Sequence, residues 1–198
     1  MVRSMRSTAR ILRTALGSGC LLLALAPGAH TATAIATVDD LSPALNQQGE
    51  VTLVGVHQRI AMGGEQSPME VAELWERFQG SPALHYAVNW SAPVAIYALY
   101  SGFSTQNPTI SLTIGYLESA LLRPAQHPEW ARRPIPTGRY LNYTAGSGGL
   151  RATLEPEGRV RSAWQRLDRD RLPTAILERY TIGADGGITQ ADVLVLYR

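Results

Sequence analysis

The spacing of hydrophobic residues divides the chain after residue 50 into two similar halves. In each half, an apolar or alternating stretch predicts a strand, a spacing of about 3.6 residues predicts a helix, and two further strands follow. The first half has predicted strands at residues 51–60, 94–103 and 109–118 and a helix at 67–78. The second half has predicted strands at 135–145, 175–183 and 191–197 and a helix from 155 to about 169.

The two predicted helices have apolar faces and polar starts. Ser67 is a candidate N-cap, Pro68 would occupy the first helical position, and Glu70 would close a capping box. Glu155, Pro156 and Glu157 begin the second helix. Residues at helical spacing line one side of each helix: Val71, Leu74, Trp75 and Phe78 in the first, and Val160, Ala163, Trp164 and Leu167 in the second. On such faces Trp75 and Trp164 are expected to pack in the core.

The repeated order strand, helix, strand, strand indicates a weak internal duplication. Two βαββ units related by a pseudo-twofold axis would form a mostly antiparallel sheet with both helices on one face, which is an α+β fold. The opposite face, or the seam between the halves, would then be free to hold a ligand.

The first 36 residues have the pattern of a secretory signal peptide. Four arginines precede an apolar run at residues 16–26, which is too short for a permanent membrane span, and small residues predict cleavage near Ala34 or Ala36. Residues 37–49 read as a polar linker or arm, and residues 50–198 as one domain. We therefore expect a periplasmic or secreted protein without a stable membrane span after cleavage. The alternative is an N-terminal anchor that is never cut.

Cleavage would change the charge and remove the only thiol. Without the four arginines of the leader, the chain keeps 14 of its 18 basic residues. Against 16 acidic residues, this gives a net charge of about −2. The sequence contains no basic patch that would indicate binding to nucleic acid. Cys20, the only cysteine, lies in the leader, so the domain would have neither disulfide nor thiol chemistry.

The predicted strand at residues 175–183 carries the strongest candidate chemistry. Alternation sends Glu178, Tyr180 and Ile182 to one face and their neighbours to the other. Glu178 is then either the polar floor of an aromatic pocket or a surface residue paired with an arginine such as Arg179. In a pocket, its partly desolvated carboxylate would favour a cationic ligand, and aromatic faces would add cation–π attraction.

The order and spacing of several segments resemble the GyrI-like small-molecule-binding domain, also found as the effector-binding domain of AraC- and MerR-type regulators. The segments are LVGV, LWERF, YALYSGF, IPTGRYLNY, AWQRL, LPTAILERY and ADVLVLY, within residues 50–198. The resemblance implies a duplicated βαββ fold with a groove at the seam that binds hydrophobic, often cationic, compounds. It also implies pocket positions for Glu178, Tyr180, Tyr97 and Tyr100. A P-x-G-x-Y element matches Pro136, Gly138 and Tyr140.

Three functions follow as hypotheses. The first is an exported, non-enzymatic protein that binds a hydrophobic or cationic small molecule without a cofactor. The second is a hydrolase of electrophilic small molecules, as the resemblance implies for some stand-alone relatives, with Glu178 and Trp164 as its catalytic pair. The third is a module that binds another protein in the groove. The candidate ligand contacts are Glu178, Tyr180, Tyr97, Tyr100, Tyr140, Tyr116 and Trp164.

Other chemistries are less well supported by the sequence. His57, His85 and His127 stand singly, without the spacing of a metal site. The loop serines lack a nucleophile-elbow context. The glycines at residues 146–149 lack the lysine of a phosphate loop. No helix-turn-helix pattern precedes the domain in this chain, so we do not expect a DNA-binding regulator. Export by the predicted signal peptide would separate the protein from gyrase, so we do not expect a gyrase inhibitor either.

Overall fold

The structure is a computed structural model, and it describes residues 35–37, 51–62, 66–91, 94–106, 108–122, 127–143, 156–167 and 170–197. The helices are α2 (Gln66–Gln79), α3 (Pro82–Tyr86) and α4 (Pro156–Gln165), with a 3-10 turn at Glu118–Ala120. The strands are β1 (Ile35–Thr37), β2 (Thr52–Ala61), β3 (Val94–Ser101), β4 (Thr109–Leu117), β5 (Ala131–Pro134), β6 (Arg139–Asn142), β7 (Pro173–Ile182) and β8 (Ile188–Tyr197).

The eight strands in the described part of the chain form one antiparallel sheet. Their order is β1-β6-β8-β7-β3-β4-β2-β5, and every pairing between neighbours is antiparallel. Strands β7 and β3 lie at the centre, although they come from different halves of the chain. The predicted α+β class with a mostly antiparallel sheet is therefore confirmed.

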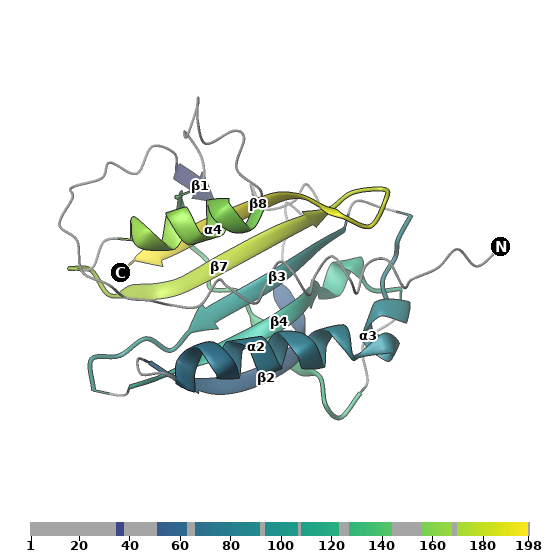
Figure 1. Cartoon of the computed structure of the whole chain (residues 1–198), viewed down its shortest axis with the longest axis horizontal. Coiled ribbons are helices and arrows are strands. Elements are labelled where there is room, and N and C mark those ends of the chain that lie inside the picture. Colours follow the sequence, from purple (N-terminus) through teal and green to yellow (C-terminus); the bar gives the residue numbers. More distant parts are fainter. Residues whose placement is uncertain are drawn as a thin grey trace.

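The sheet buries side chains on both faces. In Figure 1, α4 lies in front of β7 and β8, and α2 lies in front of β2 and β4. Side chains from both helices share one hydrophobic cluster with Ile96, Ala98 and Tyr180 of the central strands. A second cluster, which includes Leu99 and Leu177, contains no helix residue among those described. The strand period of two thus assigns neighbouring residues to different clusters.

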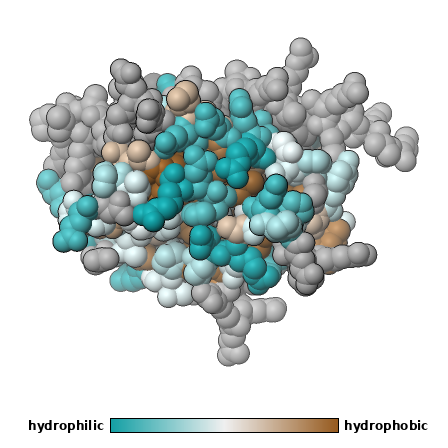
Figure 2. Space-filling view, turned by 90° about the horizontal axis from the view of Figure 1, so that it is seen from below, coloured by the Kyte–Doolittle hydropathy of each residue, from teal (hydrophilic) through white to brown (hydrophobic). Residues whose placement is uncertain are grey.

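Hydrophilic residues dominate the face of the molecule that Figure 2 shows. Seen from below, the described surface is mostly hydrophilic, with hydrophobic areas visible only in patches between polar side chains (Figure 2). Leu74, Phe78 and Ile114, in contrast, are at most 1% exposed. Burial of such side chains, at about 1.5–3 kcal/mol each, is the main term that holds the helices on the sheet.

Helix α2 begins earlier than its sequence predicts. Its first residue is Gln66, so Ser67 lies inside the helix and is not the N-cap. Glu70 does not close a capping box either, because its Oε2 accepts a hydrogen bond from the backbone N–H of Ala61, 3.0 Å away, at the end of β2. A tertiary contact has replaced the predicted local one.

The middle of the chain differs most from the prediction. Among the described residues, the predicted strand at residues 135–145 is present only as β6, and β5 lies largely in a segment for which no strand was predicted. The reason is non-local pairing. Strand β5 adds to the outer edge of β2, with Leu53 opposite Arg133, whereas β6 pairs with β8 at the other side of the sheet. The chain between β5 and β6 must therefore cross from one side to the other.

The predicted leader and arm lie outside the described residues, apart from residues 35–37. These residues form β1, which pairs with β6 through Ile35 opposite Leu141 and Thr37 opposite Arg139. In the described part of the chain, no helix is both long and apolar enough to cross a membrane.

Candidate functional site

Strand β7 holds Glu178 in the middle of the sheet. Glu178 lies opposite Ala98 of β3 on one side and Val193 of β8 on the other. Tyr180 belongs to the hydrophobic cluster on the helix side, whereas Leu177 belongs to the cluster on the opposite side. The predicted alternation along this strand is therefore confirmed, and Glu178 points with Tyr180 toward the helices. Only 3% of Glu178 is exposed.

Three aromatic residues donate hydrogen bonds to the Glu178 carboxylate. The indole Nε1 of Trp164 lies 2.5 Å from Oε1. The Tyr180 hydroxyl lies 2.9 Å from Oε2 and the Tyr100 hydroxyl 3.3 Å from the same oxygen. The donors come from α4, β7 and β3, so a helix and both central strands meet at one carboxylate.

Aromatic contacts extend this group to α2. The Trp75 ring meets the Tyr180 ring edge to face, with centroids 5.5 Å apart and an interplanar angle of 87°. The Tyr100 and Trp164 rings meet in the same way, at 5.2 Å and 78°. Trp75, Tyr180, Glu178, Tyr100 and Trp164 therefore form a continuous chain of contacts from α2 to α4, which we call the Glu178 cluster. Such aromatic pairs each add about 0.5–1.5 kcal/mol beyond burial.

Burial dominates the electrostatics of Glu178. Loss of water raises the pKa of its carboxyl above the ordinary value of 4.5, and the hydrogen bonds from Trp164, Tyr180 and Tyr100 lower that pKa by less. The carboxylate has no ion-pair partner among the described residues, whereas Glu118 pairs with Arg132 and Asp192 with Arg179. A positive charge brought to the site would therefore stabilise the ionised form.

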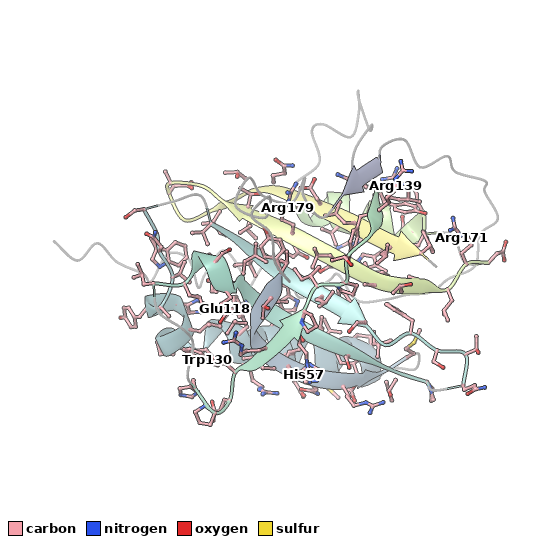
Figure 3. The ribbon with its side chains drawn as sticks, turned by 180° about the vertical axis from the view of Figure 1, so that it is seen from behind. His57, Glu118, Trp130, Arg139, Arg171 and Arg179 are labelled. Carbon is pink, nitrogen blue, oxygen red and sulfur yellow. The ribbon has the colours of Figure 1, made fainter. Side chains whose placement is uncertain are left out.

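The alternative in which Glu178 pairs with Arg179 is wrong. Arg179 points to the opposite face, where its Nε and Nη2 donate to Asp192 Oδ2 at 3.0 and 2.6 Å. Figure 3, which views the sheet from behind, labels Arg179 on that face. The Gln190 amide also donates to both oxygens of Asp192. This group was not predicted from the sequence, where the i, i+2 spacing of Gln190 and Asp192 on one strand was its only local signal.

Three candidate tyrosines do not share a site with Glu178. Tyr97 and Tyr140 lie in the cluster on the other face of the sheet. Tyr116 lies on the helix side, but its hydroxyl is 2.9 Å from Nδ1 of His85, and its ring packs against Phe78. Burial raises the pKa of the Tyr97 phenol to about 12. Of the seven predicted contacts, the structure brings together Glu178, Tyr180, Tyr100 and Trp164.

The P-x-G-x-Y element makes a local structure. The Tyr140 hydroxyl donates to the backbone oxygen of Pro136 at 2.8 Å. Gly138 has a φ of 153°, and a Cβ on it would lie 2.6 Å from a methyl carbon of Leu196. The element thus fixes the entry to β6 and lies apart from the Glu178 cluster.

Trp75, which was predicted to pack in the core, is also a member of the Glu178 cluster. Its burial agrees with that prediction, at 4% exposure, but its ring also contacts Tyr180. In the sequence, the matching positions of Trp75 and Trp164 in the two predicted helices were the signal that Trp75 could belong to the same cluster as Trp164. Among the described residues, no three His, Cys, Asp or Glu side chains lie close enough together to hold a metal ion.

Comparison with known proteins gives a structural likeness only. No protein-family model matches the chain, and a search of curated proteins finds no match. Among solved structures, an integron cassette protein from the mobile metagenome of Vibrio cholerae is similar, with a TM-score of 0.50 and 16% sequence identity. The likeness covers 83% of this chain and 95% of that one. At this identity it shows a shared fold and carries no function across.

Proposed function

We propose that this protein binds a hydrophobic, preferably cationic, small molecule at the Glu178 cluster. The observation that carries the proposal is a buried carboxylate, without a cationic partner in the described residues, that is surrounded by aromatic donors from α4, β7 and β3. A ligand cation would supply the missing charge, and the aromatic rings would supply apolar and cation–π contacts.

We also propose that the domain is a duplicated βαββ unit of the GyrI-like type. The strand order supports this. If β2, β3 and β4 correspond to β6, β7 and β8, the order β6-β8-β7-β3-β4-β2 reads the same from both ends. The pseudo-twofold axis then passes between β7 and β3, and the two helices lie on one face of the sheet. Glu178 lies beside this axis, on the seam between the halves.

Export is part of the same proposal. The basic and apolar pattern of residues 1–36 supports a signal peptide, and the domain would bind its ligand in the periplasm or outside the cell. There it would sequester the compound or present it to a partner.

Thermal melting with added ligand tests the binding proposal. Saturation at about 100 times the dissociation constant adds about 2.7 kcal/mol of stability, so lipophilic cations should raise the Tm of the wild type. Neutral aromatics of similar size should raise it less. The variant Glu178→Gln should lose the response to cations. Glu118→Gln is the matched control, because that carboxylate pairs with Arg132 and lies outside the cluster. A folded protein whose Tm responds to no compound would contradict the proposal.

The hydrogen bond between Trp164 and Glu178 supports a second candidate function, hydrolysis of an electrophilic small molecule. Glu178 would act as the base that activates water, because burial raises its pKa toward the range useful for general base catalysis. Product formation distinguishes this function from binding. Wild-type protein that turns over an electrophilic substrate, with activity lost in Glu178→Gln, would favour hydrolysis.

A further inference from the structure

We infer that the ligand of the Glu178 cluster is a flat aromatic cation with at least one N–H group, and that this group takes the place of the Trp164 indole N–H on Glu178. This inference rests on the proposed function, because it names the chemical class that the same site would accept. It adds a requirement that charge and hydrophobicity alone do not impose.

The two oxygens of the carboxylate have different partners. Oε2 receives the hydroxyls of Tyr180 and Tyr100, at 2.9 and 3.3 Å. Oε1 receives the indole N–H of Trp164, at 2.5 Å. Tyr180 lies on β7 and Tyr100 on β3, the two central strands, and each is 5% exposed. Trp164 lies on α4 and is partly exposed. It is therefore the donor that a molecule arriving from solvent can displace.

The indole itself indicates what fits beside Oε1. It is a flat aromatic group, it meets the Tyr100 ring edge to face at 5.2 Å, and it presents one N–H to a carboxylate oxygen. A ligand that occupies the same place would repeat these three features. A positive charge would add the counter-charge that Glu178 lacks among the described residues.

Displacement of the indole explains why N–H groups are required. When Trp164 leaves, Oε1 loses its donor while the carboxylate stays buried, and an unsatisfied buried acceptor is costly. A quaternary cation neutralises the charge but donates no hydrogen bond to Oε1. A cation with an N–H group does both. The site should therefore discriminate between two cations of equal charge and similar shape.

Two acridine cations provide the comparison. At neutral pH, 9-aminoacridine is a flat cation with N–H donors, and 10-methylacridinium is a flat cation of the same ring system without one. Calorimetric titration of the purified protein should give an affinity at least about tenfold higher for 9-aminoacridine, as expected for one hydrogen bond to a charged group.

Trp164→Phe tests the displacement itself. Phenylalanine keeps an aromatic ring but offers no N–H, so no hydrogen bond to Oε1 has to be broken before the ligand enters. We expect this variant to bind 9-aminoacridine several-fold more tightly than the wild type does. Trp90→Phe is the control, because the Trp90 N–H donates to the backbone oxygen of His85 and not to Glu178. Circular dichroism establishes that each variant is folded.

The outcomes separate the two proposals. Equal affinities for the two acridines, or tighter binding of 10-methylacridinium, would overturn the inference and leave the proposed function in place. Weaker binding of 9-aminoacridine by folded Trp164→Phe would show that the indole holds the ligand, and it would overturn displacement. If folded wild-type protein binds neither these cations nor other lipophilic cations, the proposed function fails and this inference fails with it.

Discussion

Glu178 combines two opposing influences on one carboxyl group. Its burial favours the neutral form, and three hydrogen-bond donors favour the charged form, with burial the larger effect. The two phenol donors are held by ring contacts, Tyr180 against Trp75 and Tyr100 against Trp164, whereas Trp164 itself is partly exposed. At the scale of the residue, the charge of the site therefore depends on pH and on each donor separately.

The stability of the protein should reflect the raised pKa of Glu178. A carboxyl whose pKa is higher in the folded state than in the unfolded state contributes stability below its unfolded pKa, near 4.5, and loses it as pH rises through the folded pKa. Compared with Glu178→Gln, the wild type should lose stability across this window, by up to about 1.4 kcal/mol per pH unit. Urea denaturation at a series of pH values measures the difference. Parallel profiles for the two proteins would contradict the raised pKa.

Removal of one phenol should raise the pKa of Glu178 further. Tyr180→Phe should have the larger effect and Tyr100→Phe the smaller, because their hydroxyls lie 2.9 and 3.3 Å from Oε2. Each variant should also lose about 1 kcal/mol of stability, the usual net value of a hydrogen bond. NMR titration of the labelled glutamate carboxyl carbons measures the pKa.

Tyr143→Phe is the control for this pair. The Tyr143 hydroxyl lies 2.9 Å from that of Tyr197 and does not contact Glu178. Its removal should leave the Glu178 titration unchanged. If Tyr100→Phe shifts the pKa more than Tyr180→Phe does, the relative strengths inferred from the two distances are wrong.

At the scale of the element, the β2–β4 pair depends on a close approach of two backbones. Gly55 and Gly115 lie opposite each other. A Cβ on Gly115 would lie 2.0 Å from the backbone oxygen of Val54, and a Cβ on Gly55 would lie 2.0 Å from that of Ile114. Neither obstacle is a flexible side chain, so the strands themselves would have to move apart.

Gly115→Ala should therefore destabilise the protein by at least about 1–3 kcal/mol, the range for overpacked sites. Chemical denaturation measures this loss. Gly187→Ala serves as the control, because a Cβ there would meet the Asp185 side chain at 3.4 Å, an ordinary contact. Comparable stabilities for the two variants would argue against the close approach of β2 and β4.

At the scale of the whole molecule, the proposed signal peptide meets the sheet at β1. Cleavage after Ala34 would keep Ile35–Thr37, which pairs with β6. Cleavage after Ala36 would remove most of that strand and expose the edge of β6. An exposed strand edge is a site for association with other chains. The cleavage site therefore determines whether β1 or β6 forms this edge of the sheet.

Two purified forms, beginning at Ile35 and at Thr37, test this consequence. The longer form should be more stable by roughly 1–3 kcal/mol, the net value of a few backbone hydrogen bonds, and should aggregate less on heating. Calorimetry and light scattering measure the two effects. Mass spectrometry of the protein recovered from the periplasm or medium identifies the natural N-terminus. Identical stability of the two forms would mean that β1 adds nothing to the sheet.

The sequence by itself determined the local features of this protein. The alternation that directs Glu178 and Tyr180 to one face follows from the period of two, and the apolar face of α2 follows from the helical period. The first is confirmed by the hydrogen bond between Tyr180 and Glu178 on the helix side of the sheet, and the second by the burial of Leu74 and Phe78. Neither depends on which strands become neighbours.

Only the tertiary structure decided which of these faces meet. Tyr100 is 78 residues from Glu178 along the chain, and it reaches the carboxylate because β3 pairs with β7 in one register. Tyr97 lies three residues earlier and is buried on the other face. Glu70 accepts a hydrogen bond from the backbone of Ala61 instead of closing the predicted capping box, and β5 pairs with β2. Local sequence limits where a side chain can point, whereas long-range packing selects its partners, because contacts between distant segments form only when the whole sheet is assembled.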